Sequence, residues 1–162
     1  MPVFYVFIAI YLHNSILFCN FVGSKKSEQH TTHYYIIMKQ VISTPEAPAA
    51  IGTYSQAIVC NGLLFASGAL GIDPKTGDFA GTDFRSQAEQ VMKNADAILR
   101  AAGTSADKVI KTTVFLADMA DFAVLNEVYA TLFHAPYPAR SAVAVKTLPK
   151  GGLVEMEFIA EV

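Results

Sequence analysis

Apolar residues recur at spacings of three and four between Asp83 and Ala102, and this pattern constrains the fold more than any other in the chain. Such a stripe is typical of an amphipathic helix that packs one face against a core. Thr82 or Asp83 can cap its start, and Gly103 suits its C-terminus. The stripe consists of Phe84, Ala88, Val91, Met92, Ala95, Ile98, Leu99 and Ala102. We therefore predict a core helix over residues 83–102.

Strand-like segments alternate with helical ones around this helix. The dipeptide Asn61-Gly62 predicts a tight turn that joins two of the strands in a hairpin. A second amphipathic helix is predicted over residues 121–133, with Asp118 as its cap and Asn126 beside its apolar stripe, where we expect the amide to be partly buried. The predicted strands span residues 56–60, 63–70, 109–116, 140–145 and 153–162.

The last two strands place polar groups by their alternation. Side chains point to opposite faces along a strand, so Val154 and Phe158 are expected on the helix-covered face and Glu155 on the other. By the same alternation Val143 is expected to face the helices, whereas Arg140 points away. The sequence therefore predicts Arg140 and Glu155 on one sheet face, opposite the core.

That uncovered face is predicted to be apolar. Ala142 and Ala144 are expected on it, with few charges to solvate it. An antiparallel sheet can leave one face wet, but an apolar second face implies a partner. We therefore expect a homo-oligomer that buries this face, with Arg140 and Glu155 in clefts between subunits.

Arg140 itself opens a small, apolar strand, in the sequence Tyr137-Pro-Ala-Arg-Ser-Ala-Val143. A guanidinium carries five donors and keeps its charge, so burying one is costly unless an anion meets it. The anion could be an internal carboxylate or the carboxylate of a small ligand. The rest of the sequence favours the ligand.

Composition argues against several other functions. Twelve Lys and Arg against fourteen Asp and Glu give a net charge of −2, without the basic excess that nucleic-acid binding needs. The two cysteines, Cys19 and Cys60, offer no disulfide framework or zinc spacing. Three of the four histidines precede residue 38, so we expect no histidine-based metal site. We also expect no metal or organic cofactor.

Residues 1–37 differ in composition from residues 38–162, and we expect the domain to be 38–162 alone. An apolar run, 3–22, precedes a polar stretch, 23–33. The run is long enough for a transmembrane helix, but polar residues at 13–15 and 20 interrupt it. No positive charge precedes it, as a secretory signal requires. We favour a third interpretation, in which Met38 is the natural start and residues 1–37 are outside the working protein. A cytoplasmic location follows, with membrane or secretory targeting by the leader as the alternative.

Several motifs, in one order, resemble those of the RidA/YjgF family over about residues 38–162. They are Pro48-Ala-Ala-Ile-Gly-Thr-Tyr-Ser-Gln-Ala57, Ser67-Gly68, Asp73-Pro-Lys-Thr-Gly77, Lys111-Thr-Thr-Val-Phe-Leu116 and Tyr137-Pro-Ala-Arg-Ser141. The resemblance implies an α+β domain, similar to chorismate mutase of the AroH type, with a single mixed β-sheet and two helices on one face. It also implies a homotrimer with ligand clefts between subunits. The activity implied is hydrolysis of 2-iminobutanoate and 2-iminopropanoate, which leak from pyridoxal-phosphate-dependent dehydratases, to 2-keto acids and ammonia.

The resemblance also implies roles for individual residues. Arg140 would bind the substrate carboxylate bidentately, helped by the backbone N–H of Gly68. Glu155 would activate the attacking water, and Tyr54 would line the pocket and hydrogen-bond to ligand or water. Asn126 would contribute from a neighbouring subunit. Structural alternatives remain open: an Arg140–Glu155 salt bridge between subunits, and Tyr54 as a loop anchor.

Further positions complete this expectation. Ser67 is expected to support the backbone rather than act as a nucleophile, because no histidine lies near it in the matched region. Many relatives have Cys where this chain has Ala142 beside the substrate, so we expect activity without thiol-based regulation. Relatives often have Gln where this chain has Ala69, which would alter pocket shape and substrate range. The alternatives are a non-catalytic regulatory trimer that binds a small carboxylate, and an RNA-directed ribonuclease or translation inhibitor.

Overall fold

The computed structural model describes residues 6–12, 15–21 and 39–162. The chain divides into two units, Met1–Ile37 and Met38–Val162. In the first, β1 (Val6–Leu12) and β2 (Ser15–Phe21) pair in antiparallel fashion, in place of the single spanning helix considered from the length of the run. The polar stretch 23–33 lies outside the described residues. The exclusion of residues 1–37 from the working protein stays a prediction.

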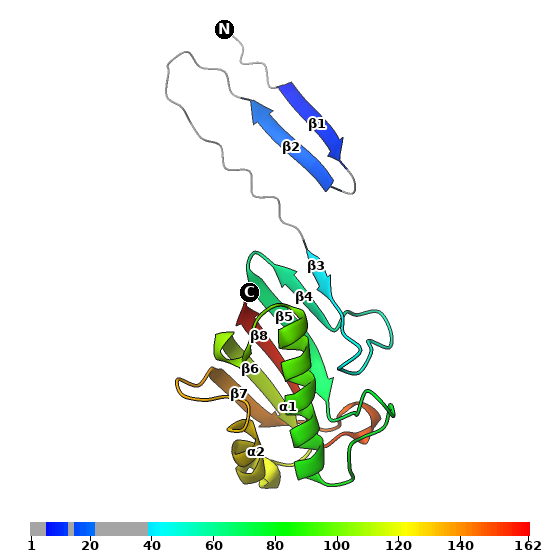
Figure 1. The fold of residues 1–162 in the computed structure, drawn as a ribbon, viewed down its shortest axis with the longest axis vertical. Helices are drawn as coiled ribbons and strands as arrows, with labels where there is room; N and C mark the ends of the chain where they lie inside the picture. The colour runs from blue at the N-terminus through cyan, green and yellow to red at the C-terminus, as the bar shows by residue number, and fades with distance from the viewer. Residues whose placement is uncertain (1–5, 13–14, 22–38) are drawn as a thin grey trace. The chain divides into compact units, whose positions relative to one another are not determined.

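The second unit is one mixed sheet with two helices, as predicted. Its six strands follow the order β3-β4-β5-β8-β6-β7, in which only β6 and β7 are parallel (Figure 1). Helices α1 (Phe84–Ala101) and α2 (Phe122–Tyr129) cover one face. The strands are β3 (Gln40–Ile42), β4 (Ala57–Cys60), β5 (Leu63–Leu70), β6 (Val109–Leu116), β7 (Ala139–Ala144) and β8 (Val154–Glu161). Three short 3-10 turns are η1 (Ala106–Lys108), η2 (Met119–Asp121) and η3 (Pro149–Gly151).

Local chemistry sets the ends of these elements. Asn61 and Gly62 both take positive φ, 53° and 75°, as the tight turn between β4 and β5 requires. Asp83 caps α1, because its side chain accepts a hydrogen bond from the N–H of Ser86 at 3.0 Å. Gly103, at φ 76°, ends the helix and donates to the carbonyl of Arg100. The expected hairpin and first helix are confirmed.

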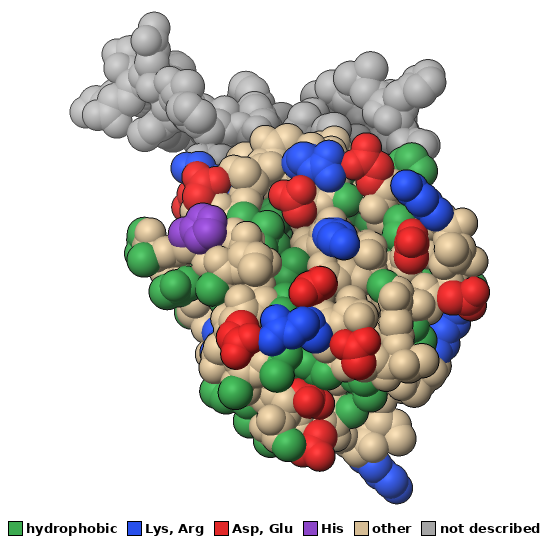
Figure 2. Space-filling view, turned by 60° about the horizontal axis from the view of Figure 1, so that its bottom comes forward, with side chains coloured by type: hydrophobic (Ala, Val, Ile, Leu, Met, Phe, Trp, Pro, Cys, Tyr) green, Lys and Arg blue, Asp and Glu red, His purple; other side chains and the backbone are tan. Residues whose placement is uncertain are grey.

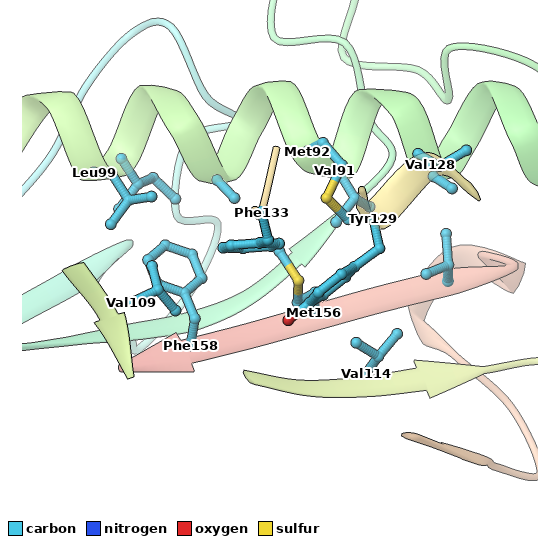
Figure 3. Close-up of a cluster of buried hydrophobic side chains, with 14 of the residues drawn as sticks. Val91, Met92, Leu99, Val109, Val114, Val128, Tyr129, Phe133, Met156 and Phe158 are labelled. Atoms are coloured by element: carbon cyan, nitrogen blue, oxygen red, sulfur yellow. The ribbon is translucent and has the colours of Figure 1, made fainter. Parts of the chain in front are cut away.

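The core lies between the helices and the sheet (Figure 3). Val154, Met156 and Phe158 of β8 point into it with at most 2% exposure, which confirms the predicted alternation of this strand. They meet Leu99 of α1 and Phe133, which follows α2. Burial of these large side chains is the main favourable term in holding the layers together.

Helix α2 is shorter than predicted: it ends at Tyr129 instead of residue 133. The Thr131 hydroxyl donates to the carbonyl of Val128 at 2.7 Å, and such a bond competes with helical pairing. The chain then tightens into turns that still bury Phe133. Asp118 caps η2, where its side chain accepts from the N–H of Ala120.

The predicted alternation of β7 is wrong. Arg140 lies over the rings of Phe122 and Tyr129, on the helix-covered side, and Val143 is 48% exposed on the other side. The error arose because both faces of this edge strand carry apolar side chains, so apolarity does not distinguish them. Ala142 packs against the core cluster and therefore does not form the uncovered face.

The uncovered face carries other apolar residues nonetheless, beside the charged Lys111 and Glu157. Phe65 is 45% exposed, and its strand partner Ile159 is half-buried. Val143 continues this surface at the sheet edge, where Phe115 pairs with it. We call this surface the open sheet face; it comprises Phe65, Phe115, Val143 and Ile159.

Candidate functional site

One group of the predicted site residues lines a pocket of about 680 Å³. We call this group the pocket site; its members are Tyr54, Ser67, Gly68 and Glu155. Ser67 and Gly68 stand at a bulge of β5, where the register with β8 shifts between Ala66 and Ala69. Bulges redirect side chains and often stand next to functional sites.

Glu155 is the pocket group with unusual acid–base properties. Burial raises the pKa of its carboxyl above the ordinary value of 4.5, and the nearby carboxylate of Glu157 raises it further. A Cβ placed on Gly68 would stand 1.8 Å from Oε1 of Glu155, so any other residue there would displace the carboxylate from its present position. The Glu155 carboxyl therefore keeps its proton to a higher pH than an ordinary glutamate.

Two pocket residues have structural contacts. The Ser67 hydroxyl donates to the carbonyl of Ser55 at 2.7 Å, and this supports the loop as expected. The Tyr54 hydroxyl accepts from the N–H of Ile51 at 3.2 Å. Tyr54 is thus a loop anchor as well as a pocket-lining residue.

A second group surrounds Arg140. Its Nη2 donates to Oδ1 of Asn126 at 2.7 Å, and its Cζ stands 4.6 Å from the ring centroid of Tyr129 and 5.4 Å from that of Phe122. We call these four residues the arginine site. None of the ion pairs between described residues includes Arg140. Among the described residues its guanidinium therefore contacts two rings and an amide but no carboxylate.

Asn126 is exposed rather than partly buried as expected. Its amide oxygen accepts the hydrogen bond from Arg140 of the same chain. The pocket site and the arginine site are separate within one chain. Arg140 lies opposite the buried Thr112 in the strand register, so its side chain faces the helices. Glu155 precedes the buried Met156 along β8, so its side chain faces away from them. The prediction of one shared face for Arg140 and Glu155 is therefore wrong.

The chain was compared with known proteins. A family model described as Endoribonuclease L-PSP matches residues 44–162. This chain belongs to the RidA/YjgF family. It is 51% identical over 124 residues to the chloroplastic Reactive Intermediate Deaminase A of Arabidopsis thaliana, and this alignment covers 76% of this chain and 66% of that protein. It is 47% identical over 124 residues to the 2-iminobutanoate/2-iminopropanoate deaminase of Rattus norvegicus, which covers 76% and 90%.

Solved structures agree with this assignment. The crystal structure of E. coli TdcF with bound serine resembles this chain with a TM-score of 0.73 at 42% identity, over 76% of this chain and 98% of that one. The α+β fold expected from the motifs is thus confirmed. The homotrimer and the cytoplasmic location stay predictions.

Sequence reasoning missed the aromatic part of this RidA/YjgF chain's arginine site. Phe122, Asn126 and Tyr129 are spaced by four and three, which places them on one helix face toward β7. That spacing, followed in the sequence by a strand that carries an arginine, was the signal that could have revealed the site. It also missed Lys150, which lines the pocket with φ 57° in a Pro-Lys-Gly-Gly turn. Sequence reasoning likewise missed Gln56 as a loop anchor. Its buried side-chain amide forms hydrogen bonds with backbone groups of Thr44, Ala47 and Pro48.

Three further properties concern residues 39–162. Within them, no cluster of three or more His, Cys, Asp or Glu side chains could hold a metal ion. The face shown in Figure 2 intersperses Lys and Arg with Asp and Glu. Of the helices in this described part of the chain, none has the length and apolar character that a membrane crossing needs.

Proposed function

We propose that this chain is a 2-imino-acid deaminase, which hydrolyses 2-iminobutanoate and 2-iminopropanoate to 2-keto acids and ammonia. The observation that carries the proposal is Arg140: a guanidinium stacked and hydrogen-bonded, but without a carboxylate partner among the described residues. Such a group suits a small carboxylate ligand. The relatives named as deaminases supply the reaction class, and the TdcF structure holds an amino acid, serine.

The chemistry needs little beyond these groups. A protonated imine carbon is already electrophilic, so water can add once it is placed and deprotonated. The Glu155 carboxylate takes a proton from the attacking water as the C–O bond forms, and a carbinolamine results. The proton then passes to the carbinolamine nitrogen. The C–N bond breaks and ammonia leaves, while the carbinolamine hydroxyl gives its proton to the Glu155 carboxylate and becomes the carbonyl of the 2-keto acid.

The proposal includes an assembly with shared clefts, because the two sites lie on opposite faces of each chain, and the family resemblance makes that assembly a homotrimer. Arg140 stands on β7, the edge strand of the sheet, where it can reach a neighbouring chain. The exposed apolar side chains of the open sheet face, next to Glu155, suit burial against such a neighbour. A cleft between two chains would then bring Arg140 and Asn126 of one chain to Glu155, Gly68 and Tyr54 of the next.

Ala142 bears on the mechanism as well. It is partly buried beside Arg140, and it places no thiol there. The water mechanism needs no thiol, so the proposed activity survives with alanine at this position. Oxidation or alkylation should therefore leave the turnover unchanged, which separates this chain from relatives with cysteine.

A coupled assay tests the proposed function. A pyridoxal-phosphate-dependent threonine dehydratase releases 2-iminobutanoate, and the rate of 2-ketobutyrate formation is followed with and without this protein. We expect the protein to accelerate ketobutyrate formation, and heat-denatured protein to have no effect. An unchanged rate, together with measurable binding of 2-ketobutyrate, would favour the regulatory carboxylate-binding alternative.

The family description, Endoribonuclease L-PSP, favours a second candidate, an RNA-directed activity. Against it stand the net charge of −2 and the mixed charges in Figure 2. RNA cleavage by the wild-type protein and by Arg140→Ala separates the candidates. Equal cleavage by both would indicate a contaminant, whereas loss in the variant would support a nuclease at this site.

A further inference from the structure

A buried pair of hydroxyls stands directly behind the arginine site. The Tyr129 hydroxyl lies 2.9 Å from Oγ1 of Thr112, and the two residues are 4% and 0% exposed. Thr112 belongs to β6, where it is the register partner of Arg140 on β7. The hydroxyl bond therefore joins the helix that carries the stacking ring to the strand beside the arginine.

Packing alone does not require these hydroxyls. Two apolar residues of the same shape, such as Phe and Val, could fill the space with little loss of stability, because both polar partners would go together. A hydrogen bond adds direction to the contact. Here it fixes the tilt of a ring that has Phe133 at 4.4 Å and the Arg140 guanidinium at 4.6 Å.

The orientation of this ring matters to Arg140. Among the described residues, the bond to Asn126 is the only side-chain hydrogen bond of the guanidinium, so four of its five N–H donors remain for a ligand. A long arginine side chain loses considerable conformational freedom when it binds. A fixed aromatic face reduces that loss by holding the guanidinium in place beforehand.

We propose that Thr112 and Tyr129 are positioning residues for Arg140: their hydrogen bond holds the Tyr129 ring so that the guanidinium is oriented for a ligand carboxylate. The choice of 2-keto and 2-imino acids as ligands rests on the proposed function. The effect on the guanidinium itself does not.

Matched substitutions in the full chain test this role. Thr112→Val keeps the shape and removes the hydroxyl, whereas Thr112→Ser keeps the hydroxyl. Tyr129→Phe and the double variant Tyr129→Phe/Thr112→Val complete the set. Thr131→Val is the control, because its exposed hydroxyl bonds only to the carbonyl of Val128.

The first readout is the guanidinium itself. The chain has three arginines, Arg85, Arg100 and Arg140, so ¹⁵N-arginine labelling gives few side-chain Nε signals. We expect the Nε order parameter of Arg140 to fall in Thr112→Val, Tyr129→Phe and the double variant. It should stay unchanged in Thr112→Ser and Thr131→Val, and Arg85 and Arg100 should not respond.

The second readout is the Kd of 2-ketobutyrate by calorimetry. We expect about tenfold weaker binding in the two single variants and in the double variant, although the double variant regains most of its thermal stability. Wild-type binding and an unchanged Arg140 signal in the double variant would overturn the proposal, as would equal losses in Thr112→Ser and Thr112→Val. If the wild-type protein neither binds 2-ketobutyrate nor hydrolyses imines, the proposed function fails, and the Nε signal still decides the positioning role.

Discussion

Arg140 and Glu155 lie on opposite faces of the same sheet. Arg140 stacks on Tyr129 under the helices, whereas the Glu155 side chain points to the other face and lines the pocket. A small 2-imino acid cannot reach both groups within one chain. The proposed mechanism therefore requires a cleft formed by two chains, and the following predictions depend on that arrangement.

Arg140→Ala removes the proposed carboxylate contact, and Arg140→Lys removes its bidentate geometry. Two charge-assisted hydrogen bonds contribute about 3 kcal/mol together, so we expect kcat/KM for imine hydrolysis to fall at least about 100-fold. Arg100→Lys is the control, since that exposed residue pairs with Asp96 and Glu46, away from the arginine site. Near-native turnover by Arg140→Ala would exclude Arg140 from the site.

Glu155→Gln should lower kcat by about 100-fold, because it removes the proposed base, while leaving 2-ketobutyrate binding close to normal. It should not destabilise the fold. The raised pKa means that the folded state holds its proton more tightly than the unfolded state, so stability falls as pH rises from 4.5 through the folded-state pKa. At pH 7 the variant should be at least as stable as the wild type, and the difference should vanish below pH 4.5. Marked destabilisation at pH 7 in thermal melts would indicate a structural role.

The acidic limb of the pH–rate profile should report Glu155, which must be ionised to accept a proton. Since burial and Glu157 raise its pKa, we expect activity to be lost on acidification at a pH above 4.5. Glu157→Gln removes the second cause and should move the limb to lower pH. Light scattering at each pH checks that assembly is unchanged. An unmoved limb in that variant would show that Glu157 does not influence the titrating group.

Phe65→Glu should disrupt the assembly, because it would bury an unpaired charge on the open sheet face. A stable interface there would typically bury well over about 1,000 Å² in total. We expect monomers by light scattering and loss of turnover, although Arg140 and Glu155 remain. Ala101→Glu, at the exposed end of α1, is the control and should stay assembled. An active Phe65→Glu monomer would argue against shared clefts.

Periodicity predicted the elements whose two faces differ in polarity. The stripe of α1 and the alternation of β8 have one apolar side and one polar side, so burial follows from the pattern. The turn at Asn61 and Gly62 was equally readable, since few residues tolerate its positive φ. These elements could be predicted without knowledge of contacts between distant parts of the chain.

The arrangement around β7 could not be predicted in the same way. Val143 is apolar yet lies on the open sheet face, and Arg140 is charged yet lies beneath α2. The position of Arg140 depends on stacking against Phe122 and Tyr129. This contact joins two separate segments, and alternation within one strand does not predict it. The motifs identified Arg140 and Glu155 as site residues, but only the structure separates them.

Mixing two inactive variants tests the shared cleft most directly. Arg140→Ala and Glu155→Gln chains are unfolded together and refolded at equal concentration, and imine hydrolysis is compared with each variant refolded alone. If each cleft takes Arg140 from one chain and Glu155 from the next, random assembly makes about one cleft in four fully wild-type, so turnover should recover to about a quarter of the wild-type rate. If the mixture stays as inactive as the separate variants while light scattering shows mixed assemblies, the two residues do not meet across an interface.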